Sequence, residues 1–447
     1  MKRFLFACAF VVLGTVTPAT VRADVKLPAV IGSHMVLQRD RPLPIWGWAE
    51  PGEAVSVTFE DQKVSAKADD KGRWKVTLNP VKADGKAHTM TIAGKNNIVL
   101  EDILIGEVWL GSGQSNMEWS INASQAAKVH RAEASKPNIR LMQIPRVQSG
   151  APAADVKASW EVCSPKTIGR FSAVLYHFGD HLQKELNVPV GLINASWGGS
   201  PIEPWIVEGK KSGGMYNGMI APLQPFTVKG FTWYQGESNV GSGMKYRDNM
   251  DRLIKGWRGA WGAELPFYFV QIAPWSGYGP GKLPPLWEAQ VASLKIPGTG
   301  MTVMTDLVDN IRDIHPGNKQ PVGHRLALWA LAKDYGKKDL VYSGPLYKGI
   351  KIDGGKARIQ FAHVGGGLQA RDGKALSEFE IAGKDGKFVA AEATIDGATV
   401  VVHSAAVAQP TQVRFGWRNT PNPNLMNKEG LPASPFRSQN WQGGTAE

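Results

Sequence analysis

The stretch EVWLGSGQSNMEW, from Glu107 to Trp119, joins an apolar run to a polar turn bounded by glycines. The run Val108–Leu110 has no polar alternation, which is typical of a strand buried on both faces. The glycines then permit a tight turn that presents Gln114, Ser115 and Asn116 where the strand ends. An ordinary turn uses the same residue types, so a functional interpretation of Ser115 needs partners elsewhere in the chain.

Five further apolar runs lack polar alternation, and segments of helical period lie among them. The runs cover residues 139–144, 188–196, 228–235, 265–273 and 300–306. Apolar side chains recur at helical spacing over residues 175–186 and 246–257. Non-alternating strands separated by amphipathic helices favour a parallel sheet covered on both sides. We therefore predict an α/β domain over residues 102–335.

The segments on either side of this domain have a different pattern. Residues 24–101 consist of short alternating runs separated by Gly, Asp and Pro, which predicts an N-terminal antiparallel β domain. Residues 336–447 return to the same period of two with glycine turns. They predict a second β module or a β extension of the central domain.

The first 23 residues predict a secretory signal peptide. A basic start is followed by an apolar run from Phe4 to Val16 and by small and polar residues that end at Ala23. The apolar run is shorter than the ~20 residues of a spanning helix. We expect cleavage near Ala23, a periplasmic or secreted location in a bacterium, and no membrane span in the mature chain. Cleavage removes Cys8 and leaves Cys163 alone, which excludes an intramolecular disulfide.

The formal net charge of the chain is +12. Its lysines are scattered and form no dense basic run, so the charge favours a solvated surface over a nucleic-acid site. We expect no nucleic-acid partner. An acidic glycan is compatible with this charge.

Four loops with reactive or polar residues follow predicted strands, at residues 113–116, 194–205, 233–239 and 309–319. Ligands of parallel α/β sheets bind beyond the carboxyl ends of the strands. A serine becomes a nucleophile when an imidazole accepts its proton. Of nine histidines, His315 is the one on a post-strand loop, which makes it the candidate partner of Ser115.

Ester cleavage also needs hydrogen-bond donors for the carbonyl oxygen that gains charge. Gly198 and Gly199 can offer backbone N–H groups, and Gln235 or Asn239 can offer a side-chain amide. The simpler alternatives are a tight turn at the two glycines and a helix cap in residues 235–239.

Five motifs, GQSNMEW, NASWGGSPIEPW, WYQGESN, DIHPGNK and NKEGLPASPFRS, resemble those of the sialate O-acetylesterases and related carbohydrate acetylesterases, in the SGNH (GDSL-like) hydrolase superfamily. The resemblance covers residues 27–438. It implies a three-layer α/β/α, flavodoxin-like domain and a serine esterase that removes O-acetyl groups from sugars, foremost sialic acid. It also implies that no metal or cofactor takes part.

By position in these motifs, Ser115 matches the nucleophile and His315 the general base. The backbone N–H of Ser115, the N–H of Gly199 and the Gln235 side chain match the oxyanion donors. The resemblance also implies residues that contact substrate: Gln114, Asn116, Trp197, Glu237 and Asn239.

The sequence departs from the superfamily pattern at the acid. Arg312 occupies the position three residues before the histidine, so Asp313 is the first choice, and Glu237, Asp309 or a Ser-His dyad are alternatives. A second departure is Trp287, where related sequences carry Arg, and we expect it to alter the substrate cleft.

Two other functions stay open from the sequence. The same chemistry could act on acetylated xylan or another plant polysaccharide. The chain could also be a non-catalytic glycan-binding protein, although the presence of both Ser115 and His315 argues against this.

Overall fold

The computed structural model describes residues 24–444, so the predicted signal peptide lies outside the described residues. Its central sheet has the strand order β15-β14-β13-β7-β10-β8-β9. Neighbouring strands are parallel except β9, which pairs antiparallel with β8. The strands are β7 Asn97–Gly113, β8 Lys136–Gln143, β9 Trp160–Cys163, β10 Val190–Ser196, β13 Gly230–Tyr234, β14 Phe267–Val270 and β15 Thr299–Thr302.

The strand order defines where a ligand would bind. Without the added pair β8 and β9, the strands taken in chain order lie as 2-1-3-4-5, which is the flavodoxin-like order. The order reverses at β7, so the crevice for a ligand lies beyond the carboxyl end of this strand. The predicted α/β fold with a central parallel sheet is confirmed.

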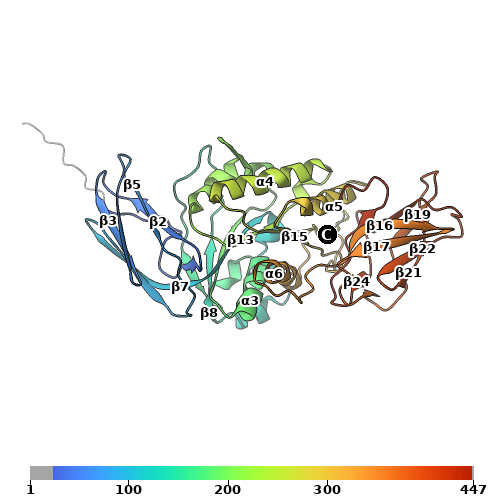
Figure 1. The fold of residues 1–447 in the computed structure, drawn as a ribbon, viewed down its shortest axis with the longest axis horizontal. Coiled ribbons are helices and arrows are strands. Elements are labelled where there is room, and N and C mark those ends of the chain that lie inside the picture. The colour runs from blue at the N-terminus through green and yellow to red at the C-terminus, as the bar shows by residue number, and fades with distance from the viewer. Residues whose placement is uncertain (1–23, 445–447) are drawn as a thin grey trace, which may run out of the picture.

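Four helices cover the sheet: α3 Ala173–Leu186, α4 Lys245–Trp261, α5 Leu283–Ala292 and α6 Gln320–Asp334. Figure 1 shows α4 and α5 on one side of β13 and β15, with α3 and α6 on the other. The predicted helical faces are buried, including Phe178 and Leu182 on α3 and Leu253 and Trp257 on α4. The layers are therefore held together by the apolar stripes that the sequence shows.

Shorter helical segments occupy the loops. They are α1 Ser115–Glu118, α2 Ala127–Ala132, η1 Ile121–Ala123, η2 Ile168–Arg170, η3 Glu203–Trp205, η4 Tyr216–Ile220, η5 Ala221–Leu223, η6 Glu237–Asn239 and η7 Ser293–Lys295. A two-stranded ribbon, β11 Val207–Glu208 and β12 Lys211–Ser212, also lies in this region.

The N-terminal β strands are β1 Val36–Gln38, β2 Leu43–Trp48, β3 Ala54–Phe59, β4 Gln62–Lys67, β5 Arg73–Leu78 and β6 His88–Ala93. Strand β7 connects them to the central sheet. Its first residues pair antiparallel with β6, whereas residues 107–113 pair parallel with β10. The boundary predicted between residues 101 and 102 thus falls inside one continuous strand, and the apolar cores of the two parts form a single cluster.

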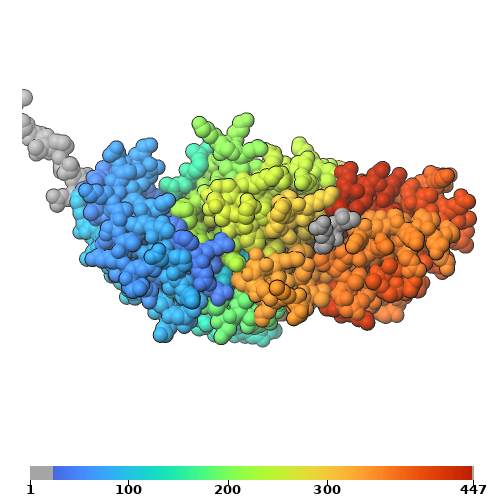
Figure 2. Space-filling view, in the orientation of Figure 1, coloured from blue at the N-terminus to red at the C-terminus, as the bar shows by residue number. Residues whose placement is uncertain are grey.

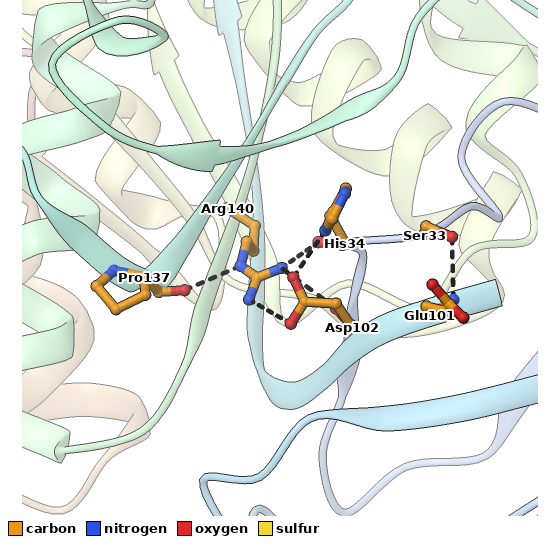
Figure 3. Close-up of polar contacts among 6 residues, drawn as sticks. All are labelled: Ser33, His34, Glu101, Asp102, Pro137 and Arg140. Carbon is orange, nitrogen blue, oxygen red and sulfur yellow. Dashed lines mark hydrogen bonds and ion pairs between the residues drawn. The ribbon is translucent and has the colours of Figure 1, made fainter.

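The change of partner along β7 occurs at Asp102, whose φ of 55° is in the left-handed region. Figure 3 shows Asp102 facing the guanidinium of Arg140 on β8. The Asp102 carboxylate accepts two hydrogen bonds from Arg140, at 2.6 and 3.0 Å, and lies 2.7 Å from His34 Nδ1. These polar contacts hold Asp102 in the left-handed region without a glycine at this position.

The C-terminal part consists of short strands: β16 Leu346–Asp353, β17 Lys356–Ala362, β18 Leu368–Ala370, β19 Phe379–Ala382, β20 Val389–Ala390, β21 Glu392–Asp396, β22 Thr399–His403, β23 Gln412–Phe415, β24 Leu425–Asn427 and β25 Phe436–Arg437. They form two four-stranded sheets and one two-stranded sheet around an apolar cluster of their own. Figure 2 shows this part packed against the end of the central domain, opposite the N-terminal strands.

Within residues 24–444, no helix is long and apolar enough to cross a membrane.

Candidate active site

Ser115 follows the carboxyl end of β7, at the point where the strand order reverses, and begins the short helix α1. The turn depends on Gly113, which has φ 137° and lies beside Tyr234 of β13. A Cβ atom on residue 113 would lie 2.2 Å from the Tyr234 carbonyl oxygen. Only glycine therefore lets the two strands approach while the chain turns to present Ser115.

His315 reaches Ser115 from the long loop that follows β15. The distance between His315 Nε2 and Ser115 Oγ is 2.9 Å, although the residues are 200 positions apart in the chain. The Trp119 ring stacks on the imidazole with centroids 4.5 Å apart. The structure thus brings together the two residues that the sequence proposes as nucleophile and base, with hydrogen-bond geometry.

The loop that carries His315 is held at several points. Its backbone carbonyls at Arg312 and Ile314 accept hydrogen bonds from Trp275 Nε1 at 3.1 Å and from Asn116 Nδ2 at 3.0 Å. These contacts come from the loops after β14 and β7. They fix the imidazole in place before any substrate binds.

Asp313 is the acid nearest to the imidazole. Its Oδ1 accepts a hydrogen bond from the His315 backbone N–H at 2.8 Å and lies 3.6 Å from Nδ1. The Asp313 side chain is 51% exposed. Burial and the charge of Lys319 lower the pKa of His315, and Asp313 opposes this shift. Asp313 therefore orients the loop and acts on the imidazole through partly screened charge.

Two backbone N–H groups remain as oxyanion donors. Neither Ser115 nor Gly199 donates its N–H to any acceptor within residues 24–444. Gly198, by contrast, donates its N–H to Glu118 Oε2 at 2.8 Å. A Cβ on Gly198 would lie 3.4 Å from Ser115 Cβ, so the glycine loop borders the serine. The N–H groups of Ser115 and Gly199 are thus available, and their roles as oxyanion donors stay predictions.

Gln235, predicted to donate to the oxyanion, donates within the protein in this structure. This fully buried side chain directs Nε2 at Gln114 Oε1, Asn239 Oδ1 and the Ser200 carbonyl, at 3.0, 2.8 and 3.3 Å. An amide nitrogen has two N–H bonds, and both are used within the protein. Gln235 thus ties the loops together, and its role as an oxyanion donor stays a prediction.

Asn239, predicted to contact substrate, is also held by hydrogen bonds within the protein. Its Nδ2 donates to Glu203, and its Oδ1 accepts from the Ile202 N–H and from Gln235. Gln114 differs, because its Oε1 accepts within the protein while its Nε2 has no acceptor among residues 24–444. Trp197 is half-buried on the loop after β10. Gln114 and Trp197 remain candidates for substrate contact.

Asn116 and Glu237, also predicted to contact substrate, lie instead in a buried network under Ser115. Asn116 Nδ2 donates to Glu237 Oε1 at 2.6 Å, and its Oδ1 accepts from Lys319 Nζ at 2.5 Å. Burial raises the pKa of Glu237 and lowers that of Lys319 to about 7. Within residues 24–444, no hydrogen bond or ion pair joins Glu237 to His315, so Glu237 is not placed as its acid partner. Lys319 was missed because a loop lysine is ordinarily exposed.

Three tryptophans near these loops are buried. Trp205 and Trp233 are fully buried in the core. Trp287 is also fully buried and donates Nε1 to the Ile272 carbonyl at 2.8 Å, and its effect on the substrate cleft stays a prediction. Within the described residues, no group of three or more His, Cys, Asp or Glu is arranged to hold a metal ion.

Comparisons with known proteins agree with this site. Residues 105–331, half of the chain, match the family model described as "Carbohydrate esterase, sialic acid-specific acetylesterase". The human protein named sialate O-acetylesterase is 32% identical, with 76% of this chain and 78% of the human protein covered. Its mouse counterpart is 29% identical, with 93% and 94% covered.

A solved structure covers nearly the whole fold. The crystal structure of a carbohydrate acetylesterase from Xanthomonas citri has 40% sequence identity and a TM-score of 0.90, and covers 93% of this chain and 100% of its own. The match therefore includes the flanking β parts as well as the α/β domain. This chain belongs to the sialic acid-specific acetylesterase family of carbohydrate esterases and is a carboxylic ester hydrolase.

Proposed function

We propose that this enzyme is a serine O-acetylesterase in which Ser115 is the nucleophile and His315 the general base. The observation that carries the proposal is the 2.9 Å contact between His315 Nε2 and Ser115 Oγ. This contact lies at the switch point of the sheet, beside the loop that carries Gly199. The non-catalytic alternative is set aside, because the family is one of carbohydrate esterases.

In the first half of the reaction, His315 Nε2 accepts the Ser115 hydroxyl proton as Oγ attacks the acetyl carbonyl carbon. The carbonyl oxygen becomes an oxyanion, which the N–H groups of Ser115 and Gly199 stabilise. The bond to the sugar oxygen then breaks, and His315 returns the proton to that oxygen. The products are the free sugar hydroxyl and acetyl-Ser115.

In the second half, a water molecule replaces the sugar. His315 accepts a proton from the water, whose oxygen attacks the acetyl carbon. The same two N–H groups stabilise the second oxyanion. Acetate leaves, and the proton returns from His315 to Ser115 Oγ.

The proposed substrate is an O-acetylated sugar, and O-acetylated sialic acid is the first candidate. The family description and the mammalian relatives name sialic acid. The Xanthomonas citri relative, at 40% identity, is named more broadly as a carbohydrate acetylesterase. That broader name is compatible with the second candidate, acetylated xylan or another plant polysaccharide.

The test measures acetate release from 9-O-acetyl sialic acid, acetylated xylan and acetylated pectin by the wild type, Ser115→Ala and His315→Ala. We expect the wild type to release acetate from at least one substrate and both variants to lose at least ~10³-fold in kcat. Thermal stability should change little, because neither side chain is part of the core. Turnover by Ser115→Ala would remove Ser115 from the mechanism.

We also propose that the enzyme is exported and cleaved near Ala23. The support is the sequence pattern of residues 1–23. The mature protein, isolated from a bacterial host, should begin near Asp24 on N-terminal sequencing. An intact Met1 in the active enzyme would contradict export through cleavage.

A further inference from the structure

Lys319 places a buried cation under the proposed catalytic pair. Lys319 lies four positions after His315 and is only 1% exposed. Nζ donates to Asn116 Oδ1 at 2.5 Å and lies 5.5 Å from the Tyr234 ring centroid and 5.8 Å from that of Trp119. Asn116 is adjacent to Ser115, and Trp119 stacks on His315, so this ammonium contacts the supports of both residues.

This position is unfavourable for a lysine by ordinary criteria. Burial of an ammonium group is strongly unfavourable unless the charge is paired. Lys319 also occupies the N-cap of α6, where the positive end of the helix dipole opposes a cation. An apolar side chain of similar length would avoid both costs. The cation therefore calls for a role beyond packing.

The charged groups that face Lys319 offset part of this cost. Glu237 and Asp313 favour its charged form, while burial lowers its pKa to about 7. The Tyr234 and Tyr278 hydroxyls are neutral near this pH, because burial raises the pKa of each. Glu118 of α1 is paired with Arg146 at 2.6 Å.

We propose that Lys319 is a positioning residue that keeps His315 in its neutral, proton-accepting form and fixes Asn116 between the serine and histidine loops. This inference rests on the function proposed above. The contacts that carry it are the bond from Lys319 to Asn116 and the bond from Asn116 to the Ile314 carbonyl, at 3.0 Å, next to His315.

The consequence for the reaction is electrostatic. A nearby cation disfavours the imidazolium form of His315, and the charge of Lys319 lowers its pKa. The imidazolium that forms when Ser115 attacks is therefore a stronger acid. It returns its proton readily to the departing sugar oxygen, and the resting imidazole stays neutral at mildly acidic pH.

The test compares the pH dependence of kcat/KM in the wild type, Lys319→Met and Lys319→Arg from pH 4 to 9. Methionine removes the charge with little loss of volume, so the acidic limb should move upward by on the order of one pH unit. Arginine keeps the charge, so its limb should stay close to the wild-type position. Lys337→Met, an exposed lysine beyond α6, should leave the profile unchanged.

A second variant keeps the test decisive if Lys319→Met does not fold. Glu237 favours the charged form of Lys319, whereas the pKa of His315 responds to burial, Lys319 and Asp313. Glu237→Gln should therefore let Lys319 lose its proton at lower pH and move the acidic limb upward, as Lys319→Met does. The pH dependence of the rate at which a fluorophosphonate labels Ser115 should show the same acidic limb and needs no sugar substrate.

An acidic limb that stays at the wild-type position in folded Lys319→Met, or in Glu237→Gln when Lys319→Met is unfolded, would overturn the inference. The proposed function is tested separately by Ser115→Ala. An inactive Ser115→Ala with an unmoved limb in Lys319→Met would remove the role of Lys319 alone.

Discussion

Ser115 and His315 are brought into contact by neighbours that sequence patterns do not reveal. Asn116 alone connects the serine loop, the Ile314 carbonyl, Glu237 and Lys319. Such a residue does not react itself but holds the reacting atoms of its neighbours in place. At the scale of single residues, the proposed catalytic pair therefore lies on a buried polar support.

The lowered pKa of His315 predicts the pH dependence of the wild type. His315 must be neutral to accept a proton, and a pKa below the ordinary value of 6.5 keeps it neutral at lower pH. Activity should therefore persist below pH 6.5 and fall as pH drops through the lowered pKa. The measurement is kcat/KM on an acetylated substrate from pH 4 to 9. An acidic midpoint at or above 6.5 would contradict this.

Asp313→Asn tests the acid. Because the carboxylate is half-exposed and 3.6 Å from Nδ1, its charge is partly screened, and we expect kcat/KM to fall about tenfold. Replacing a fully buried triad acid typically lowers kcat by ~10⁴-fold. Asp313 raises the pKa of His315, so its removal should also move the acidic limb to lower pH.

Asp309→Asn is the matched control, because Asp309 is an exposed acid of the same loop. Its kcat/KM should equal that of the wild type. A decrease of ~10⁴-fold in the kcat/KM of Asp313→Asn would show that Asp313 is a full member of a triad. An unchanged kcat/KM would indicate a Ser-His dyad.

At the scale of elements, the turn between β7 and α1 decides whether the serine is presented at all. Gly113 is in the left-handed region, and the Tyr234 carbonyl occupies the space that a Cβ would need. The strand pairing of β7 with β13 and the direction of Ser115 thus depend on the same residue.

Gly113→Ala should lower the free energy of unfolding by at least about 1–3 kcal/mol, the usual cost of such a backbone conformation. The clash with Tyr234 should also displace Ser115 and reduce kcat. Gly85→Ala is the control, because Gly85 has φ 73° but no atom within 4 Å of its added Cβ. Chemical denaturation measures the free energy of unfolding of both variants. An equal decrease in the two would show that the clash with Tyr234 has no effect.

Sequence patterns predict these elements well where apolar periodicity sets the structure. The strand that ends before Ser115, the α3 and α4 faces and the convergence of four loops follow from periodicity and from the geometry of parallel sheets. The bend in β7 could not be predicted, because Asp102 adopts it through Arg140 and not through a glycine.

The support of the site was predicted less well. Gln235 matches an oxyanion donor by its place in the motif, and the sequence gives no sign that its Nε2 donates to Gln114 and Asn239 in the structure. Such pairing between side chains on separate loops leaves no periodic signal. The burial of Lys319 depends on the same kind of contact.

At the scale of the whole molecule, the C-terminal β part supports the catalytic loop through an intermediate segment. Asn419 Nδ2 donates to the carbonyls of Tyr278 and Gly279 at 3.0 and 2.7 Å. That segment in turn holds the histidine loop, because Trp275 Nε1 donates to the Arg312 carbonyl and the Ser276 N–H to the Ile311 carbonyl. The β part thus contributes to order at the site.

Asn419→Ala should loosen this connection without removing any group that touches substrate. We expect kcat/KM to fall several-fold, on the order of 1 kcal/mol for the lost hydrogen bonds. Hydrogen exchange should quicken in residues 272–283 and 309–315. The exposed Asn422→Ala, in the same β part, is the control. Unchanged exchange in both segments would show that the β part does not order the site.

The central claim is that Ser115 is a nucleophile activated by His315, and covalent labelling tests it most directly. A fluorophosphonate should add one phosphonyl group per chain, and peptide mapping by mass spectrometry should place it on Ser115. His315→Ala should slow this labelling at least ~100-fold while remaining folded. A label on another residue, or equal labelling rates in the wild type and His315→Ala, would contradict the account.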